Sequence, residues 1–336
     1  MKIAINGWFF GQASNGSGQY LHHLLAHLPP AAPQHQFVLL VPSLSADQAS
    51  HQKIASLAAM QTHFAGMNLA DNVALQTVSQ PNLQRNLAKL WWEQFAVPRA
   101  AQQQNASRLW VPYWAAPRWQ PCPTIVTIHD LIPLLLPAYR GGRLNRLYTK
   151  LVSHTAKHTS AIITVSEASK RDVVEHLGIP AERVYAIPHG PNQAIFDAMQ
   201  WNQSDISPER ATEVQQKYQL PSQFFLYLGG FDVRKNVQST LQAYRQYLDK
   251  GGNPDIRLVI AGKLPATDTD FAPDPQRMVT ELNLLPYVDF CGWVDDADKL
   301  VVYSLAHAYI FPSVYEGFGM MVLEAMSAGT PVVTSG

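Results

Sequence analysis

The stretch YEGFGMMVLEAMSAGTPVV, residues 315–333, sets two glutamates, Glu316 and Glu324, around two glycines and a short apolar run. An apolar and aromatic run precedes it, and a proline and two valines end it. This pattern predicts a strand, a glycine-containing loop, a helix over 320–328 closed by a glycine, and a second strand. Such a strand-helix-strand unit belongs to a parallel sheet, so the stretch predicts an α/β fold.

The rest of the chain repeats this alternation of short apolar runs with helix-like segments. The runs are KIAIN, QFVLLV, RLWVPY, TIVTI, AIITV and RVYAI, and then FFLYLGG, IRLVIAG, YVDFCG, HAYIFPS and TPVVTSG. Two series of this kind predict two doubly wound, mainly parallel sheets, and 336 residues suffice for two domains. We therefore expect Rossmann-like domains over 1–195 and 222–336, joined by a polar linker over 196–221.

The composition is that of a globular protein without a strong bias toward one class of partner. Hydrophobic residues make up 47%, and 25 Lys and Arg residues balance 25 Asp and Glu residues. This balance supplies no global field for nucleic acid or an acidic membrane, so any anion site should be local. The two cysteines form no CxxC motif, which argues against a disulfide framework or a zinc site and fits a reducing cytosol. No apolar run approaches the ~20 residues that span a bilayer.

The helix start near Gly319 is a candidate anion site. Ligands of open α/β sheets bind at the carboxyl ends of the strands, and a helix start there offers free N–H groups. Gly317 and Gly319 would let the backbone approach a ligand closely. With a diphosphate at the helix start, Glu316 and Glu324 would accept hydrogen bonds from sugar hydroxyls. The alternative is that Glu316 stabilises the helix dipole and Glu324 lies on a solvated helix face.

The same stretch resembles the E-x7-E signature of retaining glycosyltransferases of family 4, EGFGLPVLEAMACGTPVV, at nearly every position. The resemblance implies a GT-B fold, in which two Rossmann-like domains face a cleft. In that family the first glutamate contacts the donor sugar, the glycine-rich backbone contacts sugar and phosphate, and the second glutamate binds the ribose. Carried over, the donor-binding residues of this stretch are Glu316, Gly317, Phe318, Gly319, Met320, Met321, Val322 and Glu324. At Met321 the family usually has proline, which bears on pocket shape and donor identity.

A basic pair, Arg234 and Lys235, lies between a strand end and a helix start in YLGGFDVRKNVQSTLQAY. Two cations at this place suit an anionic ligand, although solvated loop charges are the alternative. The resemblance implies that the pair binds the donor diphosphate. Gly230, also assigned to donor binding, stands where many family members carry the arginine.

Two motifs of the first half resemble the family's first domain. The loop GQASNGSG opens a helix and places Gly16, Ser17 and Gly18 where the family closes over the donor phosphate, although a flexible turn has the same composition. TIVTIHDLIPLLLP puts His129 at the carboxyl end of a strand, where the family has a histidine near the donor sugar. A hydrogen-bonded structural histidine is the alternative. His189, in IPHG, stands where the family often has asparagine at the domain junction.

Three other patterns imitate functional motifs. Asp268-Thr269-Asp270 has the spacing of a metal-binding DxD motif, but it lies in a polar, proline-rich loop and should be solvated. His154 and His158 have the spacing of metal ligands on a helix, but no third ligand is evident, so we expect a plain helix face. The adjacent Trp91 and Trp92 should pack in a core rather than face a membrane or an acceptor.

The resemblance thus implies a retaining hexosyltransferase that needs no metal and no cofactor beyond its donor substrate. Its catalytic residues would be Glu316, His129, Lys235 and Arg234. LGGFDVRKN and TIHDLIPL look like bacterial mannosyltransferases of surface-polysaccharide assembly, including lipopolysaccharide, which favours GDP-mannose as donor. Rhamnose, glucose and galactose donors stay open.

The expected partners are a nucleotide sugar and a glycan or lipid-linked glycan, with no nucleic acid. We expect a cytoplasmic protein, with peripheral contact at the inner membrane face as an option. A glycoside hydrolase would also use two carboxylates but would not need the basic pair. A non-catalytic sugar-nucleotide-binding protein would bind donor without turnover. The chain ends directly after a predicted strand, so the sequence also predicts an incomplete second domain that lacks a covering helix.

Overall fold

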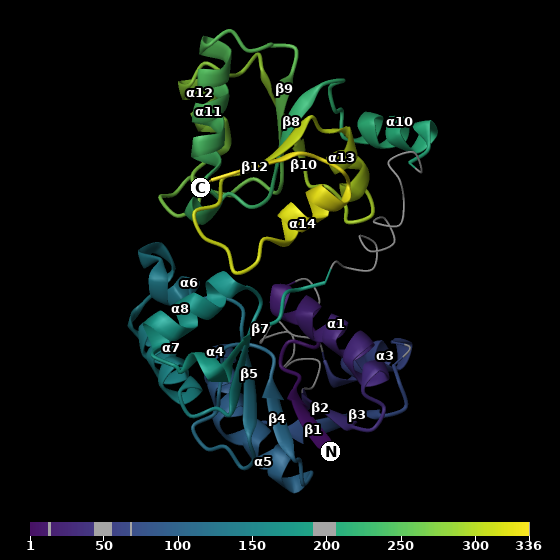
Figure 1. The fold of residues 1–336 in the computed structure, drawn as a ribbon, viewed down its shortest axis with the longest axis vertical. Helices are drawn as coiled ribbons and strands as arrows, with labels where there is room; N and C mark the ends of the chain where they lie inside the picture. Colours follow the sequence, from purple (N-terminus) through teal and green to yellow (C-terminus); the bar gives the residue numbers. More distant parts are fainter. Residues whose placement is uncertain (13–14, 44–55, 68, 191–205, 336) are drawn as a thin grey trace. The chain divides into compact units, whose positions relative to one another are not determined.

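The computed structural model describes residues 1–12, 15–43, 56–67, 69–190 and 206–335. These residues form two compact units, Met1–Pro188 and His189–Gly336. Each unit is built around its own parallel sheet with helices packed on it (Figure 1). The two sheets confirm the predicted α/β class with two doubly wound domains.

The described part of the first unit contains a sheet of seven parallel strands in the order β3-β2-β1-β4-β5-β6-β7. Its strands are β1 (Lys2–Asn6), β2 (Gln36–Ser43), β3 (Val73–Ser79), β4 (Arg108–Val111), β5 (Thr124–Ile128), β6 (Ala161–Thr164) and β7 (Val184–Ala186). All six predicted runs form strands, and β3 is an addition. β3 contains Gln, Thr and Ser beside its apolar residues, lies at the sheet edge and has no fully buried residue, so its apolar signal is weak.

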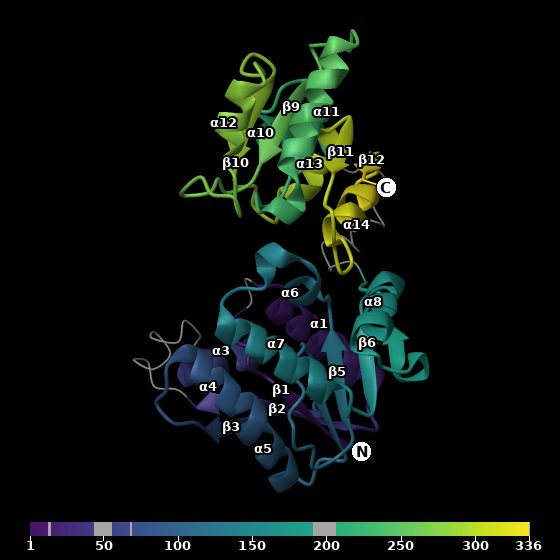
Figure 2. The same ribbon diagram turned by 90° about the vertical axis from the view of Figure 1, so that its left-hand side faces the viewer.

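The helices of the first unit lie on both faces of this sheet (Figures 1 and 2). The α-helices are α1 (Gly16–Ala31), α3 (Leu57–Gly66), α4 (Arg85–Trp91), α5 (Val97–Gln103), α6 (Ile132–Leu135), α7 (Arg143–Ala156) and α8 (Glu167–Leu177). A π-helical turn, Trp92–Ala96, joins α4 to α5, and 3₁₀ turns cover Pro137–Tyr139 and Ala181–Arg183. Helix α8 begins after Ser166, whose hydroxyl caps it by accepting a hydrogen bond from the Ser169 N–H at 3.0 Å.

The second unit has five described strands in the order β10-β9-β8-β11-β12. They are β8 (Phe224–Leu228), β9 (Arg257–Ala261), β10 (Val288–Gly292), β11 (Ala308–Phe311) and β12 (Val332–Thr334). Its helices are α10 (Pro208–Lys217), a 3₁₀ turn Val233–Lys235, α11 (Val237–Asp249), α12 (Pro275–Glu281), α13 (Lys299–Leu305) and α14 (Met320–Ser327). Every predicted strand of this half is present, and β11, α14 and β12 form the unit predicted from residues 315–333 and the apolar run before them.

The boundary between the domains differs from the predicted linker of 196–221. Residues 191–205 lie outside the described residues, but residues 206–221 belong to the second unit and contain α10. Val214, Tyr218 and Leu220 are buried in the core of that unit. The sequence did not reveal this helix because Val214 is its one fully buried apolar side chain and the rest of its face is polar.

Of the three imitating patterns, the tryptophan pair contributes to the core, whereas the other two lie on the surface. Trp92 is fully buried, and its indole N–H donates to Asn6 Oδ1 at 2.8 Å, so this tryptophan packs in the core. Asp268 is exposed and accepts a hydrogen bond from Arg277 Nε at 2.7 Å. His154 and His158 are exposed neighbours with ring centres 5.2 Å apart. Among the described residues, no three His, Cys, Asp or Glu side chains are grouped as for a metal ion. None of the described helices combines the length and the apolar character that a membrane span needs.

Candidate active site

Two loops at the carboxyl ends of β8 and β11 hold each other in place. These strands are neighbours in the sheet, so both loops emerge at the same edge. The Val314 N–H donates to the Arg234 carbonyl at 2.9 Å, and Asn236 Nδ2 donates to the Pro312 carbonyl at 3.2 Å. Arg234 Nη1 also donates to the Tyr315 carbonyl at 3.2 Å. The predicted basic pair therefore lies against the predicted glutamate loop.

Glu316 bridges the two predicted cations. Its Oε2 lies 2.6 Å from Arg234 Nη1 and its Oε1 lies 2.6 Å from Lys235 Nζ, although 81 residues separate the lysine from the glutamate. The three side chains are between 13% and 21% exposed, so these charges are shielded but reachable. Asp232 lies 3.7 Å from Arg234 Nε and completes a balanced group of four charges. The two cations thus have an internal anionic partner that an incoming anion could replace.

The start of α14 is open in the way that a ligand site requires. Gly319 has a φ of +91°, which favours glycine, and no side chain caps the helix. A pocket of about 350 Å³ lies against this loop, lined by Glu316, Phe318, Gly319, Leu323 and others. Met320, Met321 and Val322 form the first turn of the helix, and Gly317 lies in the loop before it. Backbone donors and a pocket of ligand size therefore occur together here.

Close backbone approach also shapes the β8 end. Gly262 has a φ of +144°, and a Cβ there would lie 2.2 Å from the Gly229 carbonyl oxygen. Gly230 directly follows Gly229 in the chain, and its carbonyl accepts a hydrogen bond from the Tyr227 hydroxyl at 2.6 Å. Gly262 is not among the predicted site residues, although a glycine directly after a strand, as in IRLVIAG, is a signal for close backbone approach.

Glu324 lies in the second turn of α14 and is half-buried. The Tyr303 hydroxyl of α13 donates to its Oε2 at 3.2 Å. Burial raises the pKa of Glu324, while the nearby Lys299 and the Tyr303 hydroxyl oppose that rise. The carboxylate is thus oriented through one oxygen by a neighbouring helix, so the solvated helix face of the alternative interpretation does not describe it.

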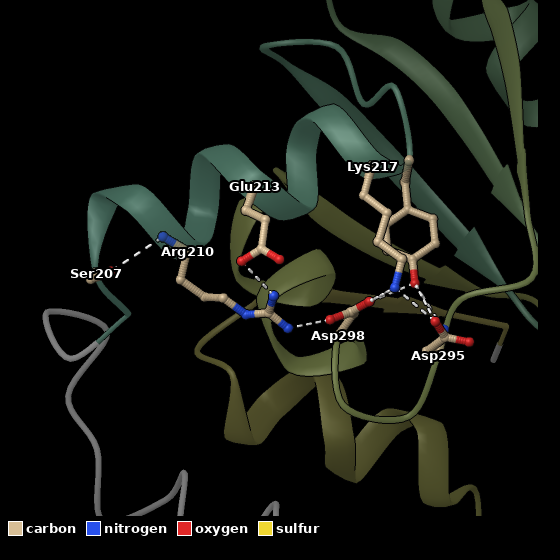
Figure 3. A network of polar contacts seen from close by, with 7 residues as sticks. Ser207, Arg210, Glu213, Lys217, Asp295 and Asp298 are labelled. Atoms are coloured by element: carbon tan, nitrogen blue, oxygen red, sulfur yellow. Dashed lines mark hydrogen bonds and ion pairs between the residues drawn. The ribbon is translucent and has the colours of Figure 1, made fainter.

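A second polar network fixes α13, the helix that carries Tyr303 (Figure 3). Asp298 directly precedes α13, and its side chain is 3% exposed. It accepts hydrogen bonds from Lys217 Nζ at 2.7 Å and from the Tyr218 hydroxyl at 2.6 Å, and Arg210 also binds it. Burial alone would raise the pKa of Asp298, but these partners lower it. Helix α10 is thereby clamped to α13, which in turn holds Glu324.

In the first unit, the described end of the glycine loop, residues 15–18, forms the capped start of α1. Asn15 Oδ1 accepts a hydrogen bond from the Gly18 N–H at 2.8 Å, which caps α1. A Cβ at Gly18 would lie 2.1 Å from the Gln12 carbonyl oxygen, so only glycine fits there. Gly16 meets no such obstacle. Gly18 is therefore explained by packing, and Gly16 and Ser17 open the helix.

His129 follows β5 at the carboxyl edge of the first sheet and is half-buried. Its Nε2 lies 3.2 Å from the Pro112 carbonyl oxygen, and its ring meets Tyr20 of α1 edge-to-face, with ring centres 4.7 Å apart. The predicted histidine and the predicted glycine loop are thus linked through α1. In the second unit, His189 meets Phe318 of the glutamate loop edge-to-face, with ring centres 5.3 Å apart.

A buried ion pair that the sequence analysis did not single out lies at the β1/β4 position, where the strand order reverses. Glu93, in the π-helical turn, is 0% exposed, and its Oε1 lies 2.6 Å from Lys89 Nζ. The Tyr148 hydroxyl donates to Glu93 at 2.9 Å. Asn6 links the Tyr113 hydroxyl and Trp92 nearby. This network joins α4, α7 and the ends of β1 and β4.

Comparison with known proteins places these features in a family. Residues 14–193 match the family model described as Glycosyltransferase Family 4, and residues 210–336 match the one described as Glycosyl transferases group 1. O-antigen chain mannosyltransferase B of Escherichia coli is 31% identical over 212 residues, which cover 63% of this chain and 52% of that protein. O-antigen chain mannosyltransferase RfbU of Salmonella typhimurium is 26% identical over 211 residues, 62% of this chain and 51% of that protein. The chain thus spans about half the length of these curated relatives.

Solved structures share the fold of this chain. HepE of Anabaena, in complex with UDP-glucose, superposes with a TM-score of 0.64 at 17% identity over 99% of this chain and 80% of its own. WaaG, a glycosyltransferase involved in lipopolysaccharide biosynthesis, has a TM-score of 0.59 at 17% identity with the same coverage. At such identities the likeness establishes the fold, which is GT-B. The family models and the fold together show that the chain belongs to glycosyltransferase family 4.

Proposed function

We propose that this chain transfers a hexose, with retention of configuration, from a nucleotide-diphosphate sugar to a hydroxyl of a glycan or lipid-linked glycan. The contact of Glu316 with both Arg234 and Lys235 carries this proposal, because it puts a sugar-binding carboxylate and two phosphate-binding cations within one ligand's reach. Mannose from GDP-mannose is the first choice of donor, supported by the names of the O-antigen relatives. Because HepE was solved in complex with UDP-glucose, a UDP-linked hexose is the alternative donor.

Donor binding would rearrange the ion pairs of the site. The diphosphate takes over Arg234 and Lys235 and occupies the uncapped start of α14. Glu316 is then released to accept hydrogen bonds from the sugar hydroxyls. In the free protein the carboxylate and the two cations therefore neutralise one another. The donor replaces this ion group with a diphosphate contact to the cations and a sugar contact to the carboxylate.

The leaving group would be stabilised by the chain's own cations, without a metal ion or another cofactor. Negative charge grows on the departing diphosphate as the glycosidic bond breaks, and Arg234 and Lys235 are preorganised against it. The sugar becomes oxocarbenium-like, as in glycoside hydrolysis. His129, at the carboxyl edge of the first sheet, is the proposed contact to the sugar from the first domain. Glu324 is the proposed acceptor for the ribose hydroxyls.

A transfer assay tests this proposal. The chain is incubated with a nucleotide sugar and an oligosaccharide acceptor, and release of nucleoside diphosphate is measured with and without EDTA. We expect release that depends on the acceptor and is unchanged by EDTA. Free sugar released from a simple glycoside without nucleotide would favour a hydrolase. Tight donor binding without turnover on any acceptor would favour a binding protein, and both results would contradict the proposal.

The raised pKa of Glu324 predicts a specific pH dependence of nucleotide binding. Only the ionised carboxylate accepts two ribose hydrogen bonds, so affinity should fall as the pH drops through this raised pKa, earlier than for an ordinary glutamate near pH 4.3. Tyr303→Phe removes a hydrogen bond to the carboxylate and should move the midpoint to higher pH. Titration calorimetry at a series of pH values measures this. Tyr247→Phe, on α11, is the matched control, and equal midpoints in all three proteins would contradict a role for Glu324.

A further inference from the structure

The zero net charge of the whole chain conceals an opposite charge on each domain. Met1–Pro188 contains fifteen Lys and Arg residues against eight Asp and Glu, whereas His189–Gly336 contains ten against seventeen. The first domain is therefore strongly basic and the second strongly acidic. A basic domain can approach an anionic surface although the protein as a whole is neutral.

The excess of positive charge is concentrated around α7. Residues 131–166 contain five Lys and Arg residues and no Asp or Glu. Arg140, Arg143, Arg146 and Lys150 are all exposed, and no carboxylate of the described residues forms an ion pair with them. Their field is therefore not cancelled locally, as it is for Arg245 or Arg277, which pair with acids on their own helices.

The same helix exposes large apolar side chains among these cations. Leu144 is 81% exposed and Leu147 is 65% exposed, while Val152, further along the helix, is buried in the core. Figure 2 shows α7 running along the outside of the first unit beside α4, to which Lys89 and Tyr148 bind it. Leu87 of α4 and Phe95 of the π-helical turn that follows it are also more than half exposed. A solvent-facing helix gains nothing from such leucines in water.

We propose that α7 and the preceding turn, Arg140 to Lys150, form a docking surface for an anionic phospholipid bilayer. A helix with cations and leucines on its outer face lies in the interfacial plane, with leucines among the acyl chains and cations at the phosphates. A purely electrostatic surface for a nucleic acid would not need the leucines. This inference deepens the proposed function and rests on it for its purpose, because docking would bring the site to a lipid-linked acceptor. The docking itself depends only on the residues of this surface.

Co-sedimentation with vesicles tests the docking surface. The full chain is mixed with vesicles of phosphatidylcholine alone or with added phosphatidylglycerol, at low and high salt. We expect binding to the anionic vesicles that is lost at high salt. Each cation near such a surface contributes about fivefold in affinity, so Arg146→Glu with Lys150→Glu should weaken binding by at least about 25-fold. Arg171→Glu with Lys250→Glu replaces two exposed cations on α8 and directly after α11, so it gives the same charge change outside α7 and should bind much more tightly.

The leucines separate a bilayer from other polyanions. Leu144→Ser with Leu147→Ser should weaken vesicle binding about tenfold while leaving retention on heparin unchanged. Both residues are exposed, so the melting temperature should stay close to that of the wild type. Absence of wild-type binding to anionic vesicles, equal loss in the control pair, or full binding by the leucine variant would overturn the proposal. Nucleotide-sugar binding without vesicles is measured in parallel, so failure of the donor site would show separately.

Discussion

Replacing Lys235 by alanine is expected to lower the rate of glycosyl transfer by about 100- to 1,000-fold. This is the usual effect of removing one preorganised donor from a developing negative charge. Lys235 Nζ lies 2.6 Å from Glu316 and 5.4 Å from the centre of the Phe311 ring, so its position is fixed on two sides. The turnover number with saturating donor and acceptor measures the effect.

The controls for this prediction separate charge from folding. Lys250→Ala removes an exposed cation after α11 and should leave turnover unchanged. Lys235→Arg retains the charge but alters its geometry, and it should recover part of the lost rate. A Lys235→Ala protein with wild-type turnover would contradict the assigned role, and loss of turnover in the Lys250 variant would show that the assay reports stability.

Replacing Glu93 by glutamine is expected to destabilise the first domain by about 3 kcal/mol. The value lies at the lower end for breaking a buried ion pair, because Lys89 is 24% exposed and keeps some water. The amide would also turn a donor group toward the Tyr148 hydroxyl, which donates to Glu93 in the native network. Tyr148→Phe leaves the ion pair intact and should cost only about 1 kcal/mol.

Urea unfolding followed by tryptophan fluorescence measures this loss, because most tryptophans, Trp92 included, lie in the first unit. Glu175→Gln, on the exposed face of α8, is the matched control and should change the unfolding free energy by less than about 0.5 kcal/mol. Equal unfolding free energies for the wild type and the Glu93 variant would show that the buried pair contributes no net stability.

The sequence predicts those parts of the fold that follow from local pattern. Residues 315–333 and the apolar run before them specify β11, α14 and β12 because their strand, glycine and helix signals agree. Edge strand β3 and helix α10 were missed because their stability comes from tertiary packing, and their own apolar pattern is weak. Elements with a strong local sequence pattern can therefore be predicted, whereas elements stabilised mainly by tertiary packing cannot.

The candidate site divides in the same way. The resemblance selected Glu316, Arg234 and Lys235 individually, and the structure adds that they form one ion group. Pattern could not reveal the contact between Glu93 and Lys89 with Tyr148, nor the clamp on Asp298, because these depend on distances between helices far apart in the chain. The roles of the site residues in donor binding stay predictions until a ligand is measured.

The net charge of the whole chain hides the opposite net charges of its two domains. The balanced number of acids and bases argued against a general attraction to acidic surfaces, but it averaged a basic domain with an acidic one. Once the domain boundary is known, the same sequence predicts a local surface around α7. Net charge is informative for each domain separately, because screening confines its effect to about 8–10 Å.

The most direct test of the account is binding of nucleotide sugars to the free chain. Thermal unfolding is measured with GDP, UDP, ADP and dTDP sugars for the wild type, Glu316→Ala and Lys235→Ala. We predict that one nucleotide sugar stabilises the wild type, by about 2.7 kcal/mol at 100 times its dissociation constant, and stabilises both variants far less. If no nucleotide sugar raises the unfolding temperature, or if the variants respond as the wild type does, the donor site is not at Glu316, Arg234 and Lys235.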